Sequence, residues 1–445
     1  MRKGFSSRFG AIAAAAGSAI GLGNIWRFPY IAGENGGGAF IFLYIVIVIV
    51  IGLPMLMSEF TLGRYTQKNV FGTFRKLAPG TKWYAIGVLG IISAFAVLSF
   101  YIVVSGWTVA FLIDAIKGTY MNMSSGEIQS SFETFSESGM GALPYIALFL
   151  IVTAFIVALG IEKGIERYNK ILMPMLVFII LILCINSFTL SGFKEGIEFI
   201  FKPDFSKITT TVALNALGQV FFSLSIGMGT MMTYGSYIRK TDNLLFTSTT
   251  VAFADATIAI LAGIAIFPAV FSYGIEPASG PELVFITLPN IFGQMIGGYY
   301  LSILFFILLF VAALTSAVSA MEVVIAYITE EFKWSRNKAV ITTTITLLIT
   351  GGLCSLSMKP DSPISIGGVS LFDICNIGSS SYLMPIGGFF IVLFMGWVFS
   401  KQALQKELSS GGRYKIIYYP FFNFIVKFVA PIAISMIFLS QIGIL

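Results

Sequence analysis

Long apolar runs constrain this chain more than any other feature of its sequence. Hydrophobic residues make up 57% of the 445 positions and charged residues 11%, which is far from the composition of soluble domains. A bilayer core requires about 20 consecutive apolar residues per helix, and the runs are continuous, whereas barrel strands alternate. We therefore predict an all-α integral membrane protein with eleven transmembrane helices, at residues 9–33, 39–63, 84–116, 142–160, 170–190, 209–237, 245–273, 296–329, 338–357, 370–400 and 417–443.

Basic residues predict how these helices are oriented. If the N-terminus is cytoplasmic, the inner segments carry 20 Lys and Arg residues and the outer connections carry 5, as the positive-inside rule requires for a plasma-membrane protein. An odd number of spans then places the C-terminus outside the cell. This asymmetry accounts for the net charge of +6. A nucleic-acid partner is not expected, because the basic residues form no single stripe.

The sequence gives little support for a metal-dependent or enzymatic function. The chain has no His, and its three cysteines, Cys184, Cys354 and Cys375, form no C-x-x-C pair, so metal and disulfide sites are weakly indicated. Without His the commonest general base is missing, and we predict that the protein is not an enzyme.

Glycine and polar residues interrupt two of the predicted helices, at Gly17–Asn24 in the first and at Ser223–Gly229 in the sixth. Glycine is common in membrane helices because it allows close packing, and packing would explain one such helix. Two interruptions placed five spans apart instead favour a binding site, because irregular backbone at this depth must line a cavity or be buried.

Other polar residues fall at similar depth, where ionisable groups are costly and usually functional. The ionisable ones are Arg27, Glu59, Asp255 and Asp373. A stripe of small residues in the eighth span follows one helix face, at positions 312, 315, 316 and 320. Such a stripe usually mediates helix packing, but its hydroxyl groups also suit a dehydrated Na⁺.

Four segments together resemble the neurotransmitter:sodium symporter family: GSAIGLGNIWRFPYIAGENGGG (17–38), PMLMSEFTLGRY (54–65), GQVFFSLSIGMGTMMTYGSY (218–237) and AALTSAVSA (312–320). The resemblance implies one transporter domain with broken helices 1 and 6 and two inverted repeats of five helices, at 1–190 and 209–400, followed by helix 11 at 417–443. It also implies a Na⁺-coupled amino-acid symporter that works by alternating access.

The resemblance further implies two sodium sites and a substrate site. The first sodium site would use Ala19, Asn24, Ser223 and Asp255, and the second Gly17, Ile20, Ala312, Thr315 and Ser316. Both sets are oxygen ligands, which a hard cation prefers. The substrate would contact Ala19, Gly21, Leu22, Gly23, Val97, Tyr101, Phe222, Ser225, Met228, Ser316 and Ala320.

Two departures from the family pattern predict specificity. Met228 and Ala320 stand where the family's leucine transporter has larger side chains, so we expect large hydrophobic or aromatic amino acids to bind. Asp255 stands where chloride-dependent animal relatives usually have asparagine, and Tyr44, Gln219 and Ser223 match their chloride ligands. A fixed carboxylate there predicts transport that does not require chloride.

The gates complete the expectations from the resemblance. The outer gate would join Arg27 to Asn376 or Asp373, and the inner gate would join Arg2 or Lys3 to Glu330, with Tyr237 nearby. Glu59 would brace the broken sixth helix. Membrane lipid and a small-molecule amino acid are the expected partners, and a homodimer is conceivable.

Two alternatives remain open at this point. One is a non-transporting amino-acid sensor or channel on the same scaffold; the channel version lacks a repeated selectivity loop. The other is a membrane enzyme, which lacks a nucleophile with a base partner.

Overall fold

The computed structural model describes residues 4–274, 283–360 and 362–441, and in these residues the elements are helices. The first half contains α1 (Arg8–Ala19), η1 (Gly23–Arg27), α2 (Phe28–Glu34), α3 (Gly38–Ile47), η2 (Val48–Gly52), α4 (Leu53–Thr66), α5 (Val70–Leu77), α6 (Tyr84–Lys117), η3 (Thr119–Asn122), α7 (Ser125–Glu137), α8 (Leu143–Ala158), η4 (Ile161–Glu166), α9 (Arg167–Ser187), α10 (Phe193–Phe201) and η5 (Phe205–Lys207).

The second half contains α11 (Thr210–Ser223), α12 (Thr230–Gly235), α13 (Leu244–Ser272), α14 (Thr287–Gln294), α15 (Gly298–Glu331), α16 (Arg336–Ser357), α17 (Leu371–Ile377), η7 (Gly378–Leu383), α18 (Met384–Leu393), η8 (Phe394–Val398), α19 (Lys401–Leu408), α20 (Tyr419–Phe424), η9 (Ile425–Val429) and α21 (Ala430–Gln441). Several consecutive elements join without a break, so that α3, η2 and α4 form one continuous helix from Gly38 to Thr66. The all-α membrane fold is confirmed.

Eight helices of the described residues are long and apolar enough to cross a bilayer, and the bent pair of Arg8–Ala19 and Gly23–Glu34 makes a ninth. The predicted span 142–160 is the shorter helix α8, because Pro144 stands in its first turn and Gly160 follows it with a φ of +88°. The predicted span 209–237 is divided between α11 and α12. The total of eleven spans therefore stays a prediction.

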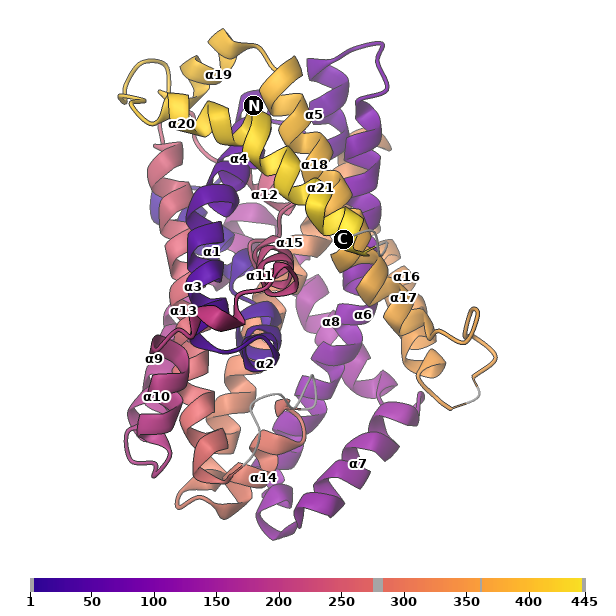
Figure 1. The fold of residues 1–445 in the computed structure, drawn as a ribbon. Helices are drawn as coiled ribbons and strands as arrows, with labels where there is room; N and C mark the ends of the chain where they lie inside the picture. Colours follow the sequence, from indigo (N-terminus) through magenta and orange to yellow (C-terminus); the bar gives the residue numbers. More distant parts are fainter. Residues whose placement is uncertain (1–3, 275–282, 361, 442–445) are drawn as a thin grey trace.

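Two helices of 34 residues each, α6 and α15, pack along one another through the bundle, and α1 packs against α9, α13 and α15. Short helices lie at both ends of the bundle: α5 and α19 at one end, and α7, α10 and α14 at the other (Figure 1). Helix α1 therefore lies inside the bundle, and nine of its residues are buried, from Gly10 to Ala19.

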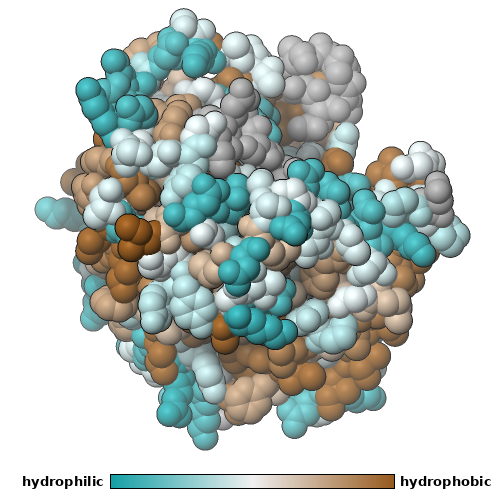
Figure 2. All heavy atoms as spheres, turned by 90° about the horizontal axis from the view of Figure 1, so that it is seen from below, coloured by the Kyte–Doolittle hydropathy of each residue, from teal (hydrophilic) through white to brown (hydrophobic). Residues whose placement is uncertain are grey.

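The end that carries α7, α10 and α14 shows how the surface is divided. Hydrophilic side chains gather in the middle of this face, and many of the hydrophobic ones lie toward its rim (Figure 2). Exposed apolar residues recur at one-turn spacing along α16, at Ile341, Ile345 and Ile349. A hydrophobic perimeter is the surface that a bilayer requires.

Candidate functional site

The first break lies between α1 and η1. Ile20 leaves the helix with a ψ of 96°, and the backbone freed there obtains partners from side chains. Asn24 Oδ1 accepts a hydrogen bond from Gly21 N at 3.1 Å, and Tyr101 Oη accepts one from Leu22 N at 3.3 Å. Because these backbone groups are buried, their pairing removes a large desolvation cost.

The second break separates α11 from α12. Gly227 and Gly229 have φ values of +91° and +76°, a region that favours glycine. The carboxylate of Glu59, from α4, accepts hydrogen bonds from Gly227 N at 2.7 Å and from Met232 N at 3.2 Å. One buried side chain thus joins the irregular segment to the first turn of α12.

An oxygen-rich cluster forms where the first break meets α15. Thr315 Oγ1 lies 3.1 Å from the carbonyl of Ala312 and 3.5 Å from that of Ile20. Ser316 Oγ lies 3.5 Å from the carbonyl of Gly17 and 3.2 Å from that of Ser18. The residues predicted for the second sodium site therefore lie together, and they offer the oxygen ligands that a hard cation prefers.

A second polar cluster surrounds Asp255 of α13, which is fully buried. Asn24 Nδ2 donates to Asp255 Oδ1 at 2.7 Å, Tyr44 Oη donates to Oδ2 at 2.8 Å, and Ser223 Oγ lies 2.8 Å from both oxygens. Among the residues that the structure describes, no Lys or Arg forms an ion pair with this carboxylate. A buried charge is costly unless it is paired or binds a metal ion.

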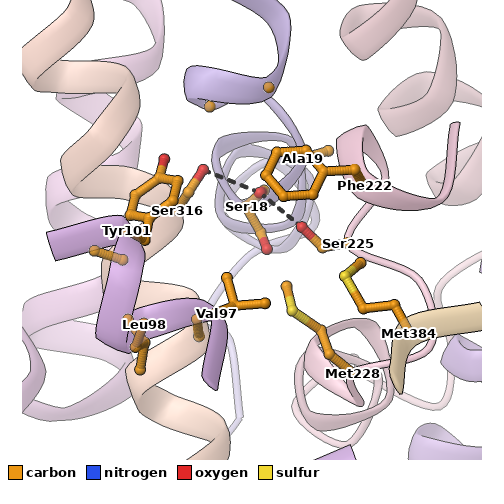
Figure 3. A pocket seen from close by; sticks show the side chains of 14 residues that line it. Ser18, Ala19, Val97, Leu98, Tyr101, Phe222, Ser225, Met228, Ser316 and Met384 are labelled. Carbon is orange, nitrogen blue, oxygen red and sulfur yellow. Dashed lines mark hydrogen bonds between the residues drawn. The ribbon is translucent and has the colours of Figure 1, made fainter. Parts of the chain in front are cut away.

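A cavity lies beside both clusters. Of the residues predicted to contact substrate, Leu22 alone does not line it. Four further residues do: Ser18, Leu98, Ala317 and Met384. Figure 3 shows hydroxyl groups on the side near the first break and the side chains of Met228 and Met384 extending toward the cavity from the opposite side. The cavity therefore has one polar end and one apolar end.

Arg27 lies on the outer side of this cavity in the predicted orientation. Its guanidinium stands over the Phe222 ring, 4.4 Å from the ring centroid, which is a cation–π contact. Within the described residues Arg27 forms no ion pair with Asp373. Asp373 instead accepts from Ser370 Oγ at 2.6 Å in the first turn of α17, while the Asn376 carbonyl accepts from Ser380. Among the described residues, the structure therefore shows neither an ion pair nor a hydrogen bond between Arg27 and its predicted outer-gate partners, and this gate stays a prediction.

At the opposite end, Glu330 Oε2 accepts hydrogen bonds from the backbone and side chain of Asn69, at 2.9 and 3.0 Å. Arg2 and Lys3, the predicted partners of Glu330, lie outside the described residues.

Tyr237 contacts an ion pair, Glu322 with Arg336, that the sequence did not indicate. Its hydroxyl donates to Glu322 Oε1 at 2.7 Å, and Arg336 binds the same carboxylate at 2.5 Å. Glu322 is fully buried and Arg336 also donates to the Val157 carbonyl at 2.7 Å. The pair therefore joins α15 to the start of α16 and to α8.

Comparison with known proteins gives consistent results. The model of the sodium:neurotransmitter symporter family matches residues 2–121 and 116–444. The sodium-dependent transporter YhdH of Bacillus subtilis is 38% identical over 442 residues, covering 99% of this chain and 98% of the relative. The sodium-dependent transporter MJ1319 of Methanocaldococcus jannaschii is 32% identical, covering 100% of this chain and 91% of the relative.

One solved structure is also very similar. It is the crystal structure of MhsT in complex with L-phenylalanine, which has a TM-score of 0.91 and 43% sequence identity and covers 99% of this chain and 100% of that one.

Proposed function

The chain belongs to the sodium:neurotransmitter symporter family, and on that premise we propose that it carries large hydrophobic or aromatic amino acids into the cell with Na⁺, by alternating access and without chloride. It is a multi-pass membrane transporter that depends on sodium. The observation that carries the proposal is a mostly apolar cavity that lies beside two buried oxygen clusters at the broken helices. Such a site brings a hard cation and an amphipathic solute to the same point.

Two Na⁺ ions would be carried in this scheme. One would bind among Thr315, Ser316 and the carbonyls of Gly17, Ile20 and Ala312, and the other beside Asp255, Asn24, Ser223 and the Ala19 carbonyl. The Asp255 carboxylate is buried and forms no ion pair with a Lys or Arg of the described residues, which supports the second assignment because a bound cation would offset its charge.

The substrate would lie with its charged groups at the break in helix 1. Its carboxylate would approach Tyr101 Oη, which now pairs with Leu22 N at 3.3 Å, and its side chain would extend toward Met228 and Met384. Methionine adapts its shape to different ligands. The bound L-phenylalanine of MhsT, which is 43% identical, supports an aromatic substrate here.

The orientation with a cytoplasmic N-terminus makes the Arg27 side the outer gate. Here Arg27 and Phe222 would close the cavity as a pair, through the cation–π contact between them. On the inner side, two contacts to α15 would hold the cytoplasmic entrance shut. Tyr237 bonds to Glu322 of this helix, and Asn69, which lies between α4 and α5, bonds to Glu330. Both sides must open in turn for alternating access.

Uptake by proteoliposomes tests this proposal. We expect labelled leucine, methionine, phenylalanine, tyrosine or tryptophan to accumulate when Na⁺ is present outside, and not when K⁺ replaces it. A sodium ionophore should abolish accumulation, because it removes the driving gradient. Saturable binding without accumulation would indicate a sensor, and preference for glycine or alanine over all of these substrates would contradict the pocket assignment.

Replacing Asp255 with asparagine tests the chloride prediction. The hydroxyl groups of Tyr44 and Ser223 point at the Asp255 carboxylate, 2.8 Å away, and the substitution removes the negative charge that they surround. We expect wild-type uptake to be the same in gluconate and in chloride, and Asp255→Asn uptake to fall several-fold in gluconate and recover with chloride. Equal uptake of the variant in both anions would refute the idea.

A further inference from the structure

Two thiols from separate helices lie next to each other, and neither lines the transport cavity. Cys354 lies near the end of α16 and Cys375 in the middle of α17, with 3.9 Å between their sulfur atoms. Cys354 is fully buried, and Cys375 is partly exposed. The sequence does not indicate this pair, because 20 residues separate the two cysteines.

The backbones around the two thiols are held close together. Three residues further along α16, Ser357 Oγ accepts a hydrogen bond from Phe372 N at 3.1 Å, and Phe372 stands three residues before Cys375. Positions three apart lie on the same helix face, so both contacts belong to one line along the α16–α17 interface. The packing of α17 on α16 therefore places the two sulfur atoms next to each other.

The ends of this interface are also fixed. Ser355 Oγ donates to the Gly139 carbonyl at 2.9 Å, in the connection between α7 and α8. Ser370 caps α17 by accepting from Asp373 N at 3.0 Å. In the proposed orientation this is the outer side of the bundle, where conditions permit disulfides.

We propose that Cys354 and Cys375 are a redox-active pair whose disulfide ties α17 to α16 and slows transport. A disulfide bond is about 2.0 Å long, so the sulfur atoms must approach by about 2 Å, which small side-chain rotations and a slight helix shift supply. With hydrogen peroxide as oxidant, the more exposed Cys375 thiol becomes a sulfenic acid and releases one water. The Cys354 thiol then attacks that sulfur, and a second water leaves as the S–S bond forms.

The consequence for transport rests on the proposed function. Phe372 of α17 packs against the rings of Trp107 and Phe100, with centroids 5.9 and 5.8 Å away, and Phe100 precedes the pocket residue Tyr101 on α6. The same span continues through η7 to Met384, which lines the cavity. Because alternating access requires the helices around the cavity to move, a covalent link on α17 restrains that motion.

Cys184 provides an internal control. It lies on α9, where its thiol donates to the Leu261 carbonyl at 3.3 Å, and so belongs to neither α16 nor α17. The test therefore uses the full-length protein in proteoliposomes, with wild type, Cys184→Ser, Cys354→Ser and Cys375→Ser. Each is treated with hydrogen peroxide, then denatured, and its remaining thiols are labelled with a maleimide and counted.

We expect the wild type to fall from three reactive thiols to one and to lose two hydrogens in its intact mass. Cys184→Ser should fall from two to none, and dithiothreitol should restore the thiols of both. Uptake by the wild type should fall at least several-fold on oxidation and recover on reduction, while Cys354→Ser should keep its uptake under the same treatment.

Two results would overturn the proposal. Three thiols that stay reactive, or a mass that gains oxygen and loses no hydrogen, would show that no disulfide forms. A disulfide that forms without changing uptake would remove the regulatory role. The thiol count does not depend on transport, so failure of the proposed function and failure of the disulfide can be told apart.

Discussion

Replacing Thr315 with alanine is expected to lower sodium-dependent uptake by about 10- to 100-fold. The hydroxyl of Thr315 lies 3.1 and 3.5 Å from the carbonyls of Ala312 and Ile20, so it is one of few oxygens that can replace the water around an entering Na⁺. A lost contact to a charged group costs about 1.5–3 kcal/mol, and each 1.4 kcal/mol corresponds to about tenfold in affinity. The measurement is the initial uptake rate as a function of Na⁺ concentration.

Two control variants separate the role of the oxygen from a general disturbance of α15. Thr315→Ser keeps the hydroxyl and should retain most of the wild-type rate. Thr329→Ala removes a hydroxyl from the same helix, where it bonds to the Ile325 carbonyl at 2.7 Å, and should leave the Na⁺ dependence unchanged. If Thr315→Ala showed the Na⁺ dependence of the wild type, the oxygen cluster would not be a sodium site.

The sequence was sufficient for the fold class and, through the family resemblance, for most of the residues that line the cavity. Apolar runs of membrane length predict the long helices because only internally hydrogen-bonded segments can cross a bilayer. The glycine-rich interruptions at 17–24 and 223–229 predict the two breaks, and the structure has them between α1 and η1 and between α11 and α12. Tyr101, Phe222, Met228 and Ser316 line the cavity as the resemblance implied.

Contacts between distant side chains were not predictable in the same way. The pairing of Glu322 with Arg336 depends on how the turn after α15 folds back, and nothing in the spacing of the two residues indicates it. Met384 lines the cavity from the start of α18, whose backbone approaches the break so closely that a Cβ on Gly227 would collide with the Met384 carbonyl. Such contacts follow from the packing of whole elements, which periodicity does not encode.

The outer gate shows a second limit of sequence reasoning. Asp373 is one turn from Asn376, and charge alone favours its pairing with Arg27. In the structure Asp373 stands at the third position of α17, where its carboxylate bonds to the Ser370 hydroxyl at 2.6 Å. A carboxylate in the first turn of a helix is stabilised by the helix dipole and the cap, and this local role competes with an ion pair to Arg27.

The break in the sixth helix depends on one carboxylate, since Glu59 is the shared acceptor for Gly227 N and Met232 N. Each oxygen serves one amide, so the two contacts cannot be replaced by a single acceptor. An unpaired buried donor costs about 1–3 kcal/mol. The side chain therefore stabilises an irregular segment that also positions Ser225 and Met228 in the cavity wall.

Replacing Glu59 with alanine is accordingly expected to abolish detectable uptake and to destabilise the protein by about 2–6 kcal/mol, the cost of two unpaired amides. Glu59→Gln keeps one acceptor oxygen but turns an NH₂ group toward the other amide, so we expect a loss of similar kind and smaller size. Ser58→Ala is the matched control, because Ser58 is equally buried but donates only to the Pro54 carbonyl of its own helix. The measurements are uptake and the thermal unfolding midpoint in detergent. Wild-type values of both for Glu59→Ala would mean that the glycine backbone holds the break without help, and that Glu59 is buried for another reason.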